Sequence, residues 1–480
     1  MGQMPVPTYL PPVLRPQLSP QQAAQFTRDR VLHSAGIAGA ERADPWDPSR
    51  DVARPSMPDF IVDAQGTPGP HLCRSVGEAV SRAVRYAQAT GRRRRIYIEI
   101  APGRYEGLVY VPRLLVQGTN VPITLYARSA DPTDTCLHAN IDAEMPGAEY
   151  ARHFGPQMAD VAPEIKEIFQ CIAARDKITT AHASVLRIEG DGCQIFGLTI
   201  QNTYNADRPQ GDEAPGTHAG RFQQSTGQHQ AVALLVAGAD RVHGANLHLK
   251  SHQDTLYLQS PGPFSTVRSY FEACLIEGDV DFIFGQATSF FHRCEVKSLG
   301  ARAPHAWATA PSTNLRTRYG LVFDDCDFTH DGKGNARKGT FSLGRQWFEG
   351  VRATPYGQAP VSGYTCDLDS QSAYAPPKGT ISAATLEAVG KCVIVNSRIG
   401  AHINRAAPWD EWNGGRFDTD GTYHPGAWSA RYRPVQCTAG DMQRLLGPWQ
   451  RAQEIDLSDI DPAMVFLGEF NNRALADPAV

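Results

Sequence analysis

The sequence lacks several features that mark common classes of protein. Its longest apolar runs are far shorter than the ~20 residues that cross a bilayer, which excludes a transmembrane helix. An excess of basic residues is absent too: the 480 residues carry a formal net charge of -4, so the chain as a whole is not attracted to nucleic acid or anionic membranes. The opening residues contain no basic segment followed by an apolar one, so we predict no export signal in them.

Two kinds of catalytic or metal motif are missing as well. The ten cysteines form no C-x-x-C pair and no cluster with histidine at zinc-finger spacing, so a structural metal site is not expected. There is no G-x-S-x-G nucleophile elbow, which argues against a serine triad built around His252. Hydrophobic residues make up 41% of the chain and charged residues 20%, so we expect it to fold around a core.

The composition divides the chain near residue 58. Residues 1–57 are rich in Pro, Gln, Arg and Asp and are predicted to form an N-terminal arm, and residues 58–480 are predicted to form a single domain. Residues 74–88 place small apolar side chains at helical spacing, which predicts one short amphipathic helix. The alternating segment RIYIEI after it predicts a strand.

Beyond about Ser184, short β-rich segments recur with Gly, Asn and Asp between them. Alignment of five segments as equivalent rungs gives the apolar markers Ile200, Leu249, Ile276, Val296 and Phe328. The last three gaps are 27, 20 and 32 residues, and we expect the first, of 49 residues, to hold two turns. Irregular periods without intervening helices favour a parallel β-helix over a βαβ sheet or a propeller.

Two segments depart from this rhythm. Residues 131–180 contain polar and proline-containing stretches and one helical piece, APEIKEIFQCIAAR, and are predicted to form a long excursion from one coil. Near the end of the chain, AGDMQRLLGPWQRAQ predicts another helix. We expect both segments to cap or flank the coil stack.

Three strings place ionisable or amide side chains among apolar strand residues: QDTLY at 253–257, GDVDFIFG at 278–285 and LGRQW at 343–347. With HQAVAL at 229–234 and EFNNR at 469–473, they resemble the signature motifs of the pectin methylesterase (pectinesterase) family. The long segment at residues 131–180 resembles the family's bacterial envelope-associated branch more than its plant or fungal branches. The resemblance covers most of the chain beyond residue 58. It implies an all-β fold, a right-handed parallel β-helix with a short N-terminal capping helix and peripheral helices and loops.

The resemblance also implies a function and a role for each matching residue. The protein would hydrolyse methyl esters of polygalacturonate, with Asp281 as nucleophile and Asp254 as general acid and later base. Arg345 would hold Asp281 charged and oriented for attack. Gln253 and Gln230 would donate N–H groups to the oxyanion. This chemistry requires no metal and no organic cofactor.

The same residues have plainer interpretations. Taken singly, an aspartate in a β-rich chain is more often a turn former, and an Arg–Trp pair more often a surface stack. Five matching polar residues in the family's order favour a site. Two carboxyl groups held close together cannot both ionise cheaply, so one pKa rises and the two roles separate.

Aromatic residues in these strings are expected to form walls of the substrate cleft. Trp347 offers a flat face to a sugar ring, and Tyr257 and Phe284 are placed beside it. For Phe284 a core position is equally open, because alternate residues of a strand point into the coil. The string LGRQW has Gln346 where the family has proline, but it retains the arginine and the tryptophan.

Cys274 and Cys294 flank VDFIFG and are 20 residues apart, about one coil. We predict a disulfide between them, with stacked free thiols as the alternative. By its resemblance the protein is expected to be a secreted, periplasmic or outer-membrane-associated monomer that binds pectin, with no nucleic acid partner and no membrane span.

Two other functions are left open by the sequence. The same site could hydrolyse a different ester, such as an acyl thioester. A catalytically silent β-helix that binds envelope polysaccharide is the third hypothesis, and the presence of both aspartates argues against it.

Overall fold

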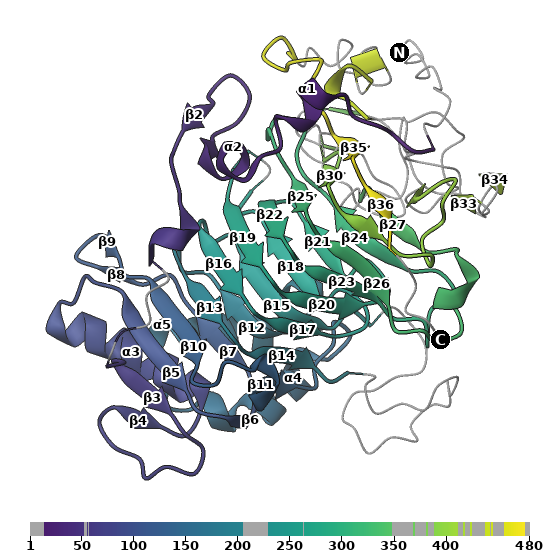
Figure 1. Ribbon diagram of the computed structural model, residues 1–480. Coiled ribbons are helices and arrows are strands. Elements are labelled where there is room, and N and C mark those ends of the chain that lie inside the picture. Colours follow the sequence, from purple (N-terminus) through teal and green to yellow (C-terminus); the bar gives the residue numbers. More distant parts are fainter. Residues whose placement is uncertain are drawn as a thin grey trace.

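The computed structural model describes residues 14–51, 57–204, 229–262, 264–347, 388–410 and 456–475, together with residue 55 and short stretches between 368 and 444. In this part of the chain, three long parallel sheets run the length of an elongated stack (Figure 1).

Each of the three sheets is a row of hydrogen-bonded neighbouring strands. In spatial order, the first sheet contains β35 (Leu467–Phe470), β30 (Cys392–Val395), β25 (Leu321–Asp324), β22 (Thr288–His292), β19 (Arg268–Glu272), β16 (Val242–Ala245), β13 (Gln194–Phe196), β10 (Ile123–Ala127), β5 (Ile96–Ile100), β3 (Phe60–Val62) and β4 (Leu72–Cys73). The second contains β36 (Arg473–Ala474), β31 (Arg398–Ile399), β26 (Asp327–His330), β23 (Glu295–Ser298), β20 (Leu275–Gly278), β17 (His248–Lys250), β14 (Thr199–Asn202), β11 (Thr135–Ala139) and β6 (Gly103–Glu106). The third contains β32 (Trp409–Asp410), β27 (Ser342–Arg345), β24 (Trp307–Pro311), β21 (Ile283–Gly285), β18 (Leu256–Gln259), β15 (Val232–Ala237), β12 (Ser184–Ile188) and β7 (Val109–Val111).

From β5 onward the chain passes through the three sheets in rotation. One coil consists of β19, β20 and β21, and the next consists of β22, β23 and β24. Each strand pairs in parallel with the equivalent strand of the neighbouring coil. This is a parallel β-helix, so the predicted fold is confirmed.

The register of the second sheet confirms the rung alignment made from the sequence. Its strands pair through Ile200, Leu249, Ile276, Val296 and Phe328 in succession. The expectation of two turns in the 49-residue gap is wrong, because Ile200 and Leu249 are direct partners. The extra length belongs to a single coil, and residues 205–228 of it lie outside the described residues.

The core lies inside the coils, where inward-facing side chains stack from one coil to the next. Phe271, Phe291 and Phe323 form such a column, with ring centroids 5.2 and 4.4 Å apart. Stacking in register gives the central ring, Phe291, van der Waals contact with a ring on both faces. The interior thereby fixes the positions of the corners between strands, where the polar motifs lie.

The predicted helix at residues 74–88 is confirmed as α3 (Val76–Thr90), which covers the first coils of the stack (Figure 1). It begins at Ser75, whose hydroxyl accepts the N–H of Glu78, and it ends at Gly91 with φ +68°. Such caps satisfy the free backbone groups at both helix ends. The strand expected next is β5.

The N-terminal segment runs along the first sheet from the last coil to the first. It contains α1 (Pro20–Ala23), α2 (Arg28–His33), β1 (Ser34–Ala35) and β2 (Arg42–Ala43). The backbone N–H of Leu18 donates to the carbonyl of Glu469 and the backbone N–H of Glu469 donates to the carbonyl of Pro16, both at 2.9 Å. Helix α2 packs on β19 and β22 (purple in Figure 1). The buried Arg268 of β19 bonds Asp44 of this segment at 2.8 Å and Asp240 at 2.7 Å.

The excursion predicted at residues 131–180 begins later than expected. After a 3-10 turn, residues 135–139 form β11, a regular rung that pairs with β6 and β14. The polar, proline-containing residues before β11 hide the start of this strand in the sequence. The chain leaves the coil after Ala139 and forms α4 (Gly147–Phe154) and α5 (Pro163–Ala173), which pack together. The second of these confirms the predicted helix, whereas the helix expected at 439–453 lies largely outside the described residues.

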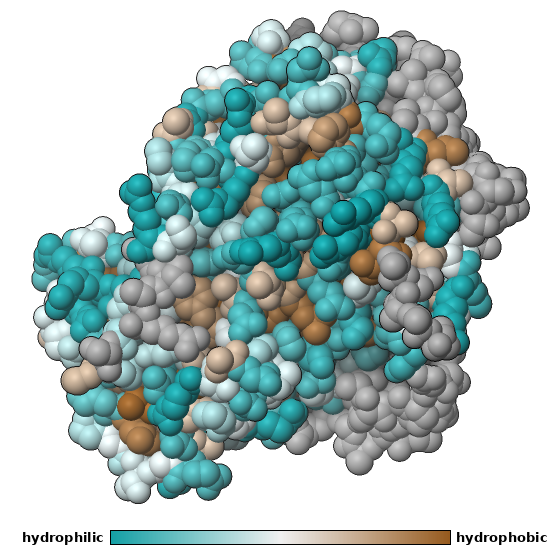
Figure 2. All heavy atoms as spheres, viewed as in Figure 1, coloured by the Kyte–Doolittle hydropathy of each residue, from teal (hydrophilic) through white to brown (hydrophobic). Residues whose placement is uncertain are grey.

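Short peripheral elements complete the described chain. They are β8 (Leu115–Val116), β9 (Thr119–Asn120), β28 (Leu368–Asp369), β29 (Ile381–Ser382), β33 (Arg416–Phe417), β34 (Tyr423–His424), and the 3-10 helices η1 (Pro48–Asp51), η2 (Pro132–Asp134), η3 (Pro156–Met158), η4 (Thr180–His182) and η5 (Ala336–Lys338). Figure 2 shows a mostly hydrophilic surface over the middle of the stack. None of the described helices has the length and apolar character needed to span a bilayer.

Candidate active site

Asp254 and Asp281 occupy the same corner of two consecutive coils, directly before strands of the third sheet. Leu256 and Ile283 are paired in register, and each aspartate comes two residues before one of them. The backbone N–H of Asp254 donates to the carbonyl of Val280 at 3.1 Å. The 27-residue spacing of the two motifs is therefore one coil.

Both aspartates have a left-handed backbone, with φ +68° at Asp254 and +52° at Asp281. This conformation costs a non-glycine residue about 1–2 kcal/mol and is common at functional sites. Ala273 and Arg293, at corners between the first two sheets, have φ +52° as well. The strain therefore belongs to the tight corners of this fold and does not by itself mark the site.

Arg345, at the end of β27, forms a two-pronged ion pair with Asp281. Its Nε lies 2.8 Å from Oδ1 and its Nη2 lies 2.6 Å from Oδ2. The side chains are 13% and 10% exposed, so water screens the pair little. Such a pair fixes the orientation of the carboxylate.

Asp254 lies in a different electrostatic environment. Burial raises the pKa of its carboxyl group well above the usual value, and the neighbouring charge of Asp281 raises it further. Arg345 opposes this shift without cancelling it. One carboxyl group is thus paired with a cation, and the other retains its proton to a higher pH.

The two glutamines lie next to these aspartates along the coils. Gln253 directly precedes Asp254 and is 9% exposed. Gln230 lies one coil earlier, just before β15, and the N–H of Ala231 donates to the carbonyl of Gln253 at 3.1 Å. The backbone thereby places both predicted oxyanion donors beside the aspartate corner.

A buried His–Asp pair beside Gln230 was missed from the sequence. His229 bonds through Nδ1 to Asp142, which belongs to the excursion after β11, and Tyr204 stacks on the imidazole at 5.3 Å. The N–H of Ala143 also donates to the carbonyl of Gln230 at 2.9 Å. The excursion therefore supports the segment that leads into β15, a long-range contact that no local pattern signals.

A second Asp–Arg pair was also missed, although its aspartate lies within the GDVDFIFG motif. Arg302 bonds both oxygens of the fully buried Asp279, at 2.8 and 2.6 Å. Burial opposes the charge of Asp279, yet the Arg302 guanidinium outweighs it and lowers the pKa of that carboxyl group. The position two residues before Asp281 is the only local signal for this pair.

The predicted aromatic wall lies on the outer face of the third sheet. Tyr257 and Phe284 stack at 4.2 Å with an 18° interplanar angle, and Trp347 meets Phe284 edge-on at 5.9 Å. Phe284 does not point into the coil, where Ile283 lies instead. Tyr257 and Phe284 are only 3% exposed, so the half-buried Trp347 offers more surface than either.

Gln346, which replaces the family's proline, has a structural partner in this chain. It is buried, and its side-chain N–H donates to the carbonyl of Gly390 at 3.1 Å. The next residue, Trp347, donates its backbone N–H to Pro311 at 2.8 Å. These bonds hold the end of β27 without a proline.

The predicted disulfide is not present. Cys274 and Cys294 are both free, and they lie in a column with a third buried thiol, Cys326. Neighbouring strands of a sheet are about 4.8 Å apart, whereas the Cβ atoms of a disulfide are usually closer, near ~3.8 Å. Each thiol instead lies within hydrogen-bond distance of backbone carbonyls, so stacked free thiols, the alternative, are observed.

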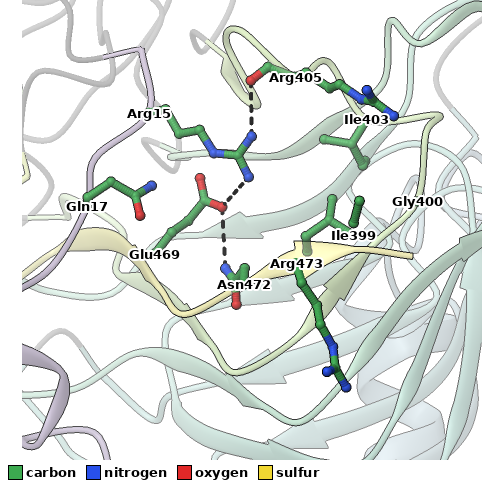
Figure 3. Close-up of a pocket in the computed structure, with 10 residues that line it drawn as sticks. Arg15, Gln17, Ile399, Gly400, Ile403, Arg405, Glu469, Asn472 and Arg473 are labelled. Atoms are coloured by element: carbon green, nitrogen blue, oxygen red, sulfur yellow. Dashed lines mark hydrogen bonds and ion pairs between the residues drawn. The ribbon is translucent and has the colours of Figure 1, made fainter. Parts of the chain in front are cut away.

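The described residues contain no group of three or more His, Cys, Asp or Glu side chains that could hold a metal ion. A pocket of about 600 Å³ lies at the last coil, where Arg15 joins Glu469 at 2.9 Å and the carbonyl of Arg405 at 3.0 Å (Figure 3). Arg405 and Arg473 extend away from Arg15 rather than toward a common point (Figure 3). This pocket is a junction between the N-terminal segment and the end of the stack.

The fold and the site together define a class: a parallel β-helix in which two aspartates on consecutive coils and a guanidinium from a later coil meet at one corner. The Pectinesterase family model matches residues 221–354. The pectinesterase of Ralstonia solanacearum is 30% identical over 408 residues, which cover 84% of this chain and 85% of that protein. The chain belongs to the pectinesterase family and is a carboxylic ester hydrolase, as its motifs predicted.

Two further proteins are similar over much of their length. The putative acyl-CoA thioester hydrolase YbhC of Escherichia coli is 28% identical over 335 residues, covering 68% of this chain and 71% of that protein. The crystal structure of Escherichia coli YbhC matches with a TM-score of 0.66 over 99% of both chains, at 21% identity. The structure of rice weevil pectin methyl esterase matches with a TM-score of 0.64 over 97% of this chain and 98% of that one, at 23% identity. These structural matches support the fold.

Proposed function

We propose that this protein hydrolyses methyl esters of polygalacturonate and releases methanol, with Asp281 as nucleophile and Asp254 as general acid and then base. The observation that carries the proposal is the asymmetry of the two carboxyl groups. Arg345 pairs with Asp281 through two hydrogen bonds, while burial and the nearby charge raise the pKa of Asp254. Nucleophilic attack needs an oriented carboxylate, which the pair with Arg345 offers at Asp281. Protonation of the leaving group needs a carboxyl group that keeps its proton, which the raised pKa offers at Asp254.

In the first step, a carboxylate oxygen of Asp281 attacks the ester carbonyl carbon. The carbonyl oxygen becomes an oxyanion, which the amide N–H groups of Gln253 and Gln230 stabilise. Asp254 gives its proton to the methoxy oxygen as the C–O bond breaks. Methanol leaves, and the acyl group remains on Asp281 as an anhydride.

In the second step, Asp254 is a carboxylate and takes a proton from water. The water oxygen attacks the acyl carbon of the substrate, and the bond to Asp281 breaks. Asp281 becomes a carboxylate again, Asp254 regains its proton, and the product leaves as a uronic acid that ionises in solvent.

The aromatic residues of the third sheet support a sugar substrate. Trp347 is half-buried, and the stacked pair of Tyr257 and Phe284 lies beside it. A flat indole that is partly exposed can offer a stacking face to a pyranose ring. A substrate of this kind belongs to the plant cell wall, so the proposal also implies an enzyme that acts outside the cytoplasm.

The thioester hypothesis stays as a second candidate because of the similarity to the putative acyl-CoA thioester hydrolase YbhC. The test is a comparison of methanol released from highly methylated polygalacturonate with thiol released from palmitoyl-CoA, at equal enzyme concentration. The proposal expects methanol release above the buffer rate and no thiol release. Thiol release without methanol would replace the proposed substrate with an acyl thioester.

A further inference from the structure

We propose that Trp307, held by Asp410, is a positioning residue that fixes the guanidinium of Arg345 against Asp281. The inference rests on the proposed function for its kinetic consequence. Its structural basis is a chain of contacts from Asp410 to Trp307, then to Arg345, and finally to the proposed nucleophile.

Trp307 begins β24, one coil beyond Asp281. Ile283 pairs with Thr309, so Trp307 holds the position that Asp281 holds on the preceding coil. The backbone N–H of Trp307 donates to the backbone carbonyl of Asp279 at 3.0 Å, which joins the tryptophan to the coil that carries Asp281. Asp254, Asp281 and Trp307 thus follow one another on three successive coils.

The indole of Trp307 lies under the guanidinium of Arg345. The guanidinium carbon is 3.9 Å from the ring centroid, well within the range of a cation–π contact. In this arrangement the edge of the guanidinium stays free to bond Asp281, because the ring occupies its face and the carboxylate occupies Nε and Nη2. The ring therefore restricts the plane of the guanidinium without competing for its hydrogen bonds.

Asp410 fixes the other end of this contact. Its Oδ2 accepts the indole N–H of Trp307 at 2.9 Å, and Asp410 is itself directly in register with Arg345 between β27 and β32. Asp410 is 9% exposed, so the bond is shielded from water. A tryptophan bonded in this way cannot rotate away from the arginine without losing a partner.

Glycine at position 344 permits the close approach of the strands. A Cβ there would lie 2.1 Å from the hydroxyl of Thr309, so β27 could not pair with β24 at this separation. Arg345 follows immediately, and its long side chain reaches the Trp307 ring on the neighbouring strand. The guanidinium of Arg345 is thereby held between the Trp307 ring and the Asp281 carboxylate.

This geometry predicts an effect on turnover rather than on substrate binding. A nucleophile that loses its orientation by a fraction of an ångström attacks more slowly, and we expect Trp307→Leu to lower kcat for methanol release by roughly 10–50-fold, with KM changed less than about twofold. Trp307→Phe retains an aromatic face and should recover most of that loss. Asp410→Leu should lower kcat several-fold when it is the only substitution. When it is added to Trp307→Leu, it should change kcat little.

The decisive experiment is a double-mutant cycle with Arg345→Lys. If Trp307 acts through the Arg345 guanidinium, its substitution should have little further effect on kcat once that guanidinium has been removed. We therefore expect Trp307→Leu to lower kcat by less than about twofold in the Arg345→Lys background. An equal loss in both backgrounds, or a raised KM that persists with Arg345→Lys, would make Trp307 a packing or substrate-contact residue and overturn the inference. Trp46→Leu, in the N-terminal segment away from the third sheet, is the matched control and should leave kcat unchanged.

A measurement without turnover separates this inference from the proposed function. The Arg345 Nε–H proton, assigned by its loss in Arg345→Lys, should show an upfield NMR shift from the indole ring current in the wild type, and the shift should vanish in Trp307→Leu. An unchanged signal would refute the stacking role even in a protein inactive on pectin. Absence of methanol release by the wild type would refute the proposed function and leave the NMR result to decide the inference.

Discussion

Asp254 and Asp281 hold equivalent positions on consecutive coils, yet only Asp281 is paired with a guanidinium. Arg345 bonds both oxygens of Asp281, whereas Asp254 has no cation within ion-pair distance among the described residues. The repeat of the fold supplies two similar corners, and one arginine from a later coil makes their chemistry different. The proposed division into nucleophile and acid follows from that single difference.

Removal of the guanidinium should therefore abolish most activity. We expect Arg345→Ala to lower kcat for methanol release by about 100–1000-fold, because the nucleophile loses both its orientation and its counter-charge. Arg398→Ala is the matched control, since Arg398 pairs with Asp327 through two bonds on the second sheet. The control should retain nearly wild-type kcat, and equal losses in both variants would mean that the effect is on stability alone.

The two glutamines should contribute to the transition state rather than to ground-state binding. Gln253→Ala is expected to lower kcat by about 100-fold or more, equivalent to roughly 3 kcal/mol, with little change in KM. Gln230→Ala should act in the same direction. Gln201→Ala, on the second sheet, is the control. A rise in KM with unchanged kcat would show that the amides bind substrate and do not stabilise the oxyanion.

The raised pKa of Asp254 makes a prediction about stability. The folded protein binds the Asp254 proton more tightly than the unfolded chain does. The contribution of this group to the free energy of unfolding is therefore fully present below the ordinary carboxyl pKa, near 3.8, and is lost as pH rises through the raised pKa of the folded state. Asp254→Asn should therefore raise the melting temperature at pH 8 and leave it close to wild type at pH 4. Melting curves across this range test it, and an equal shift at both pH values would contradict the assigned cause.

The three stacked thiols should be chemically free in the purified protein. Denaturation without reductant, followed by alkylation and mass spectrometry, should find Cys274, Cys294 and Cys326 modified singly. In the native protein the same thiols should react slowly, because all three are buried away from the reagent. A peptide in which two of them are linked would restore the disulfide predicted from the sequence.

Much of the fold was predictable because the β-helix repeats a local pattern. Apolar residues such as Ile276 and Val296 mark the inward positions of successive rungs, and their alignment survives irregular loop lengths. The number of turns was wrong between Ile200 and Leu249, where loop length was mistaken for an extra turn, although the two residues are aligned correctly. Gap length alone cannot distinguish a long loop from a coil.

The site was predictable where its residues lie in short motifs and unpredictable where they meet across coils. Asp254, Asp281 and Arg345 carry recognisable strings, and the structure brings them together. Trp307 and Asp410 lie in no such string. The strand register places Asp410 beside Arg345, and the Arg345 side chain reaches the Trp307 ring from a position that is not opposite it. The disulfide between Cys274 and Cys294 was wrongly predicted. A sequence spacing of one coil places two cysteines on neighbouring strands, but a disulfide needs their Cβ atoms to be closer than neighbouring strands bring them.

The most direct test of the proposed mechanism measures methanol released from highly methylated polygalacturonate by wild type, Asp281→Ala and Asp254→Asn, each shown by melting curve to be folded. We predict sustained release by the wild type, a rate for Asp281→Ala no higher than buffer, and a loss for Asp254→Asn of several orders of magnitude. Release by Asp281→Ala at the wild-type rate would contradict the claim that this carboxylate attacks the ester.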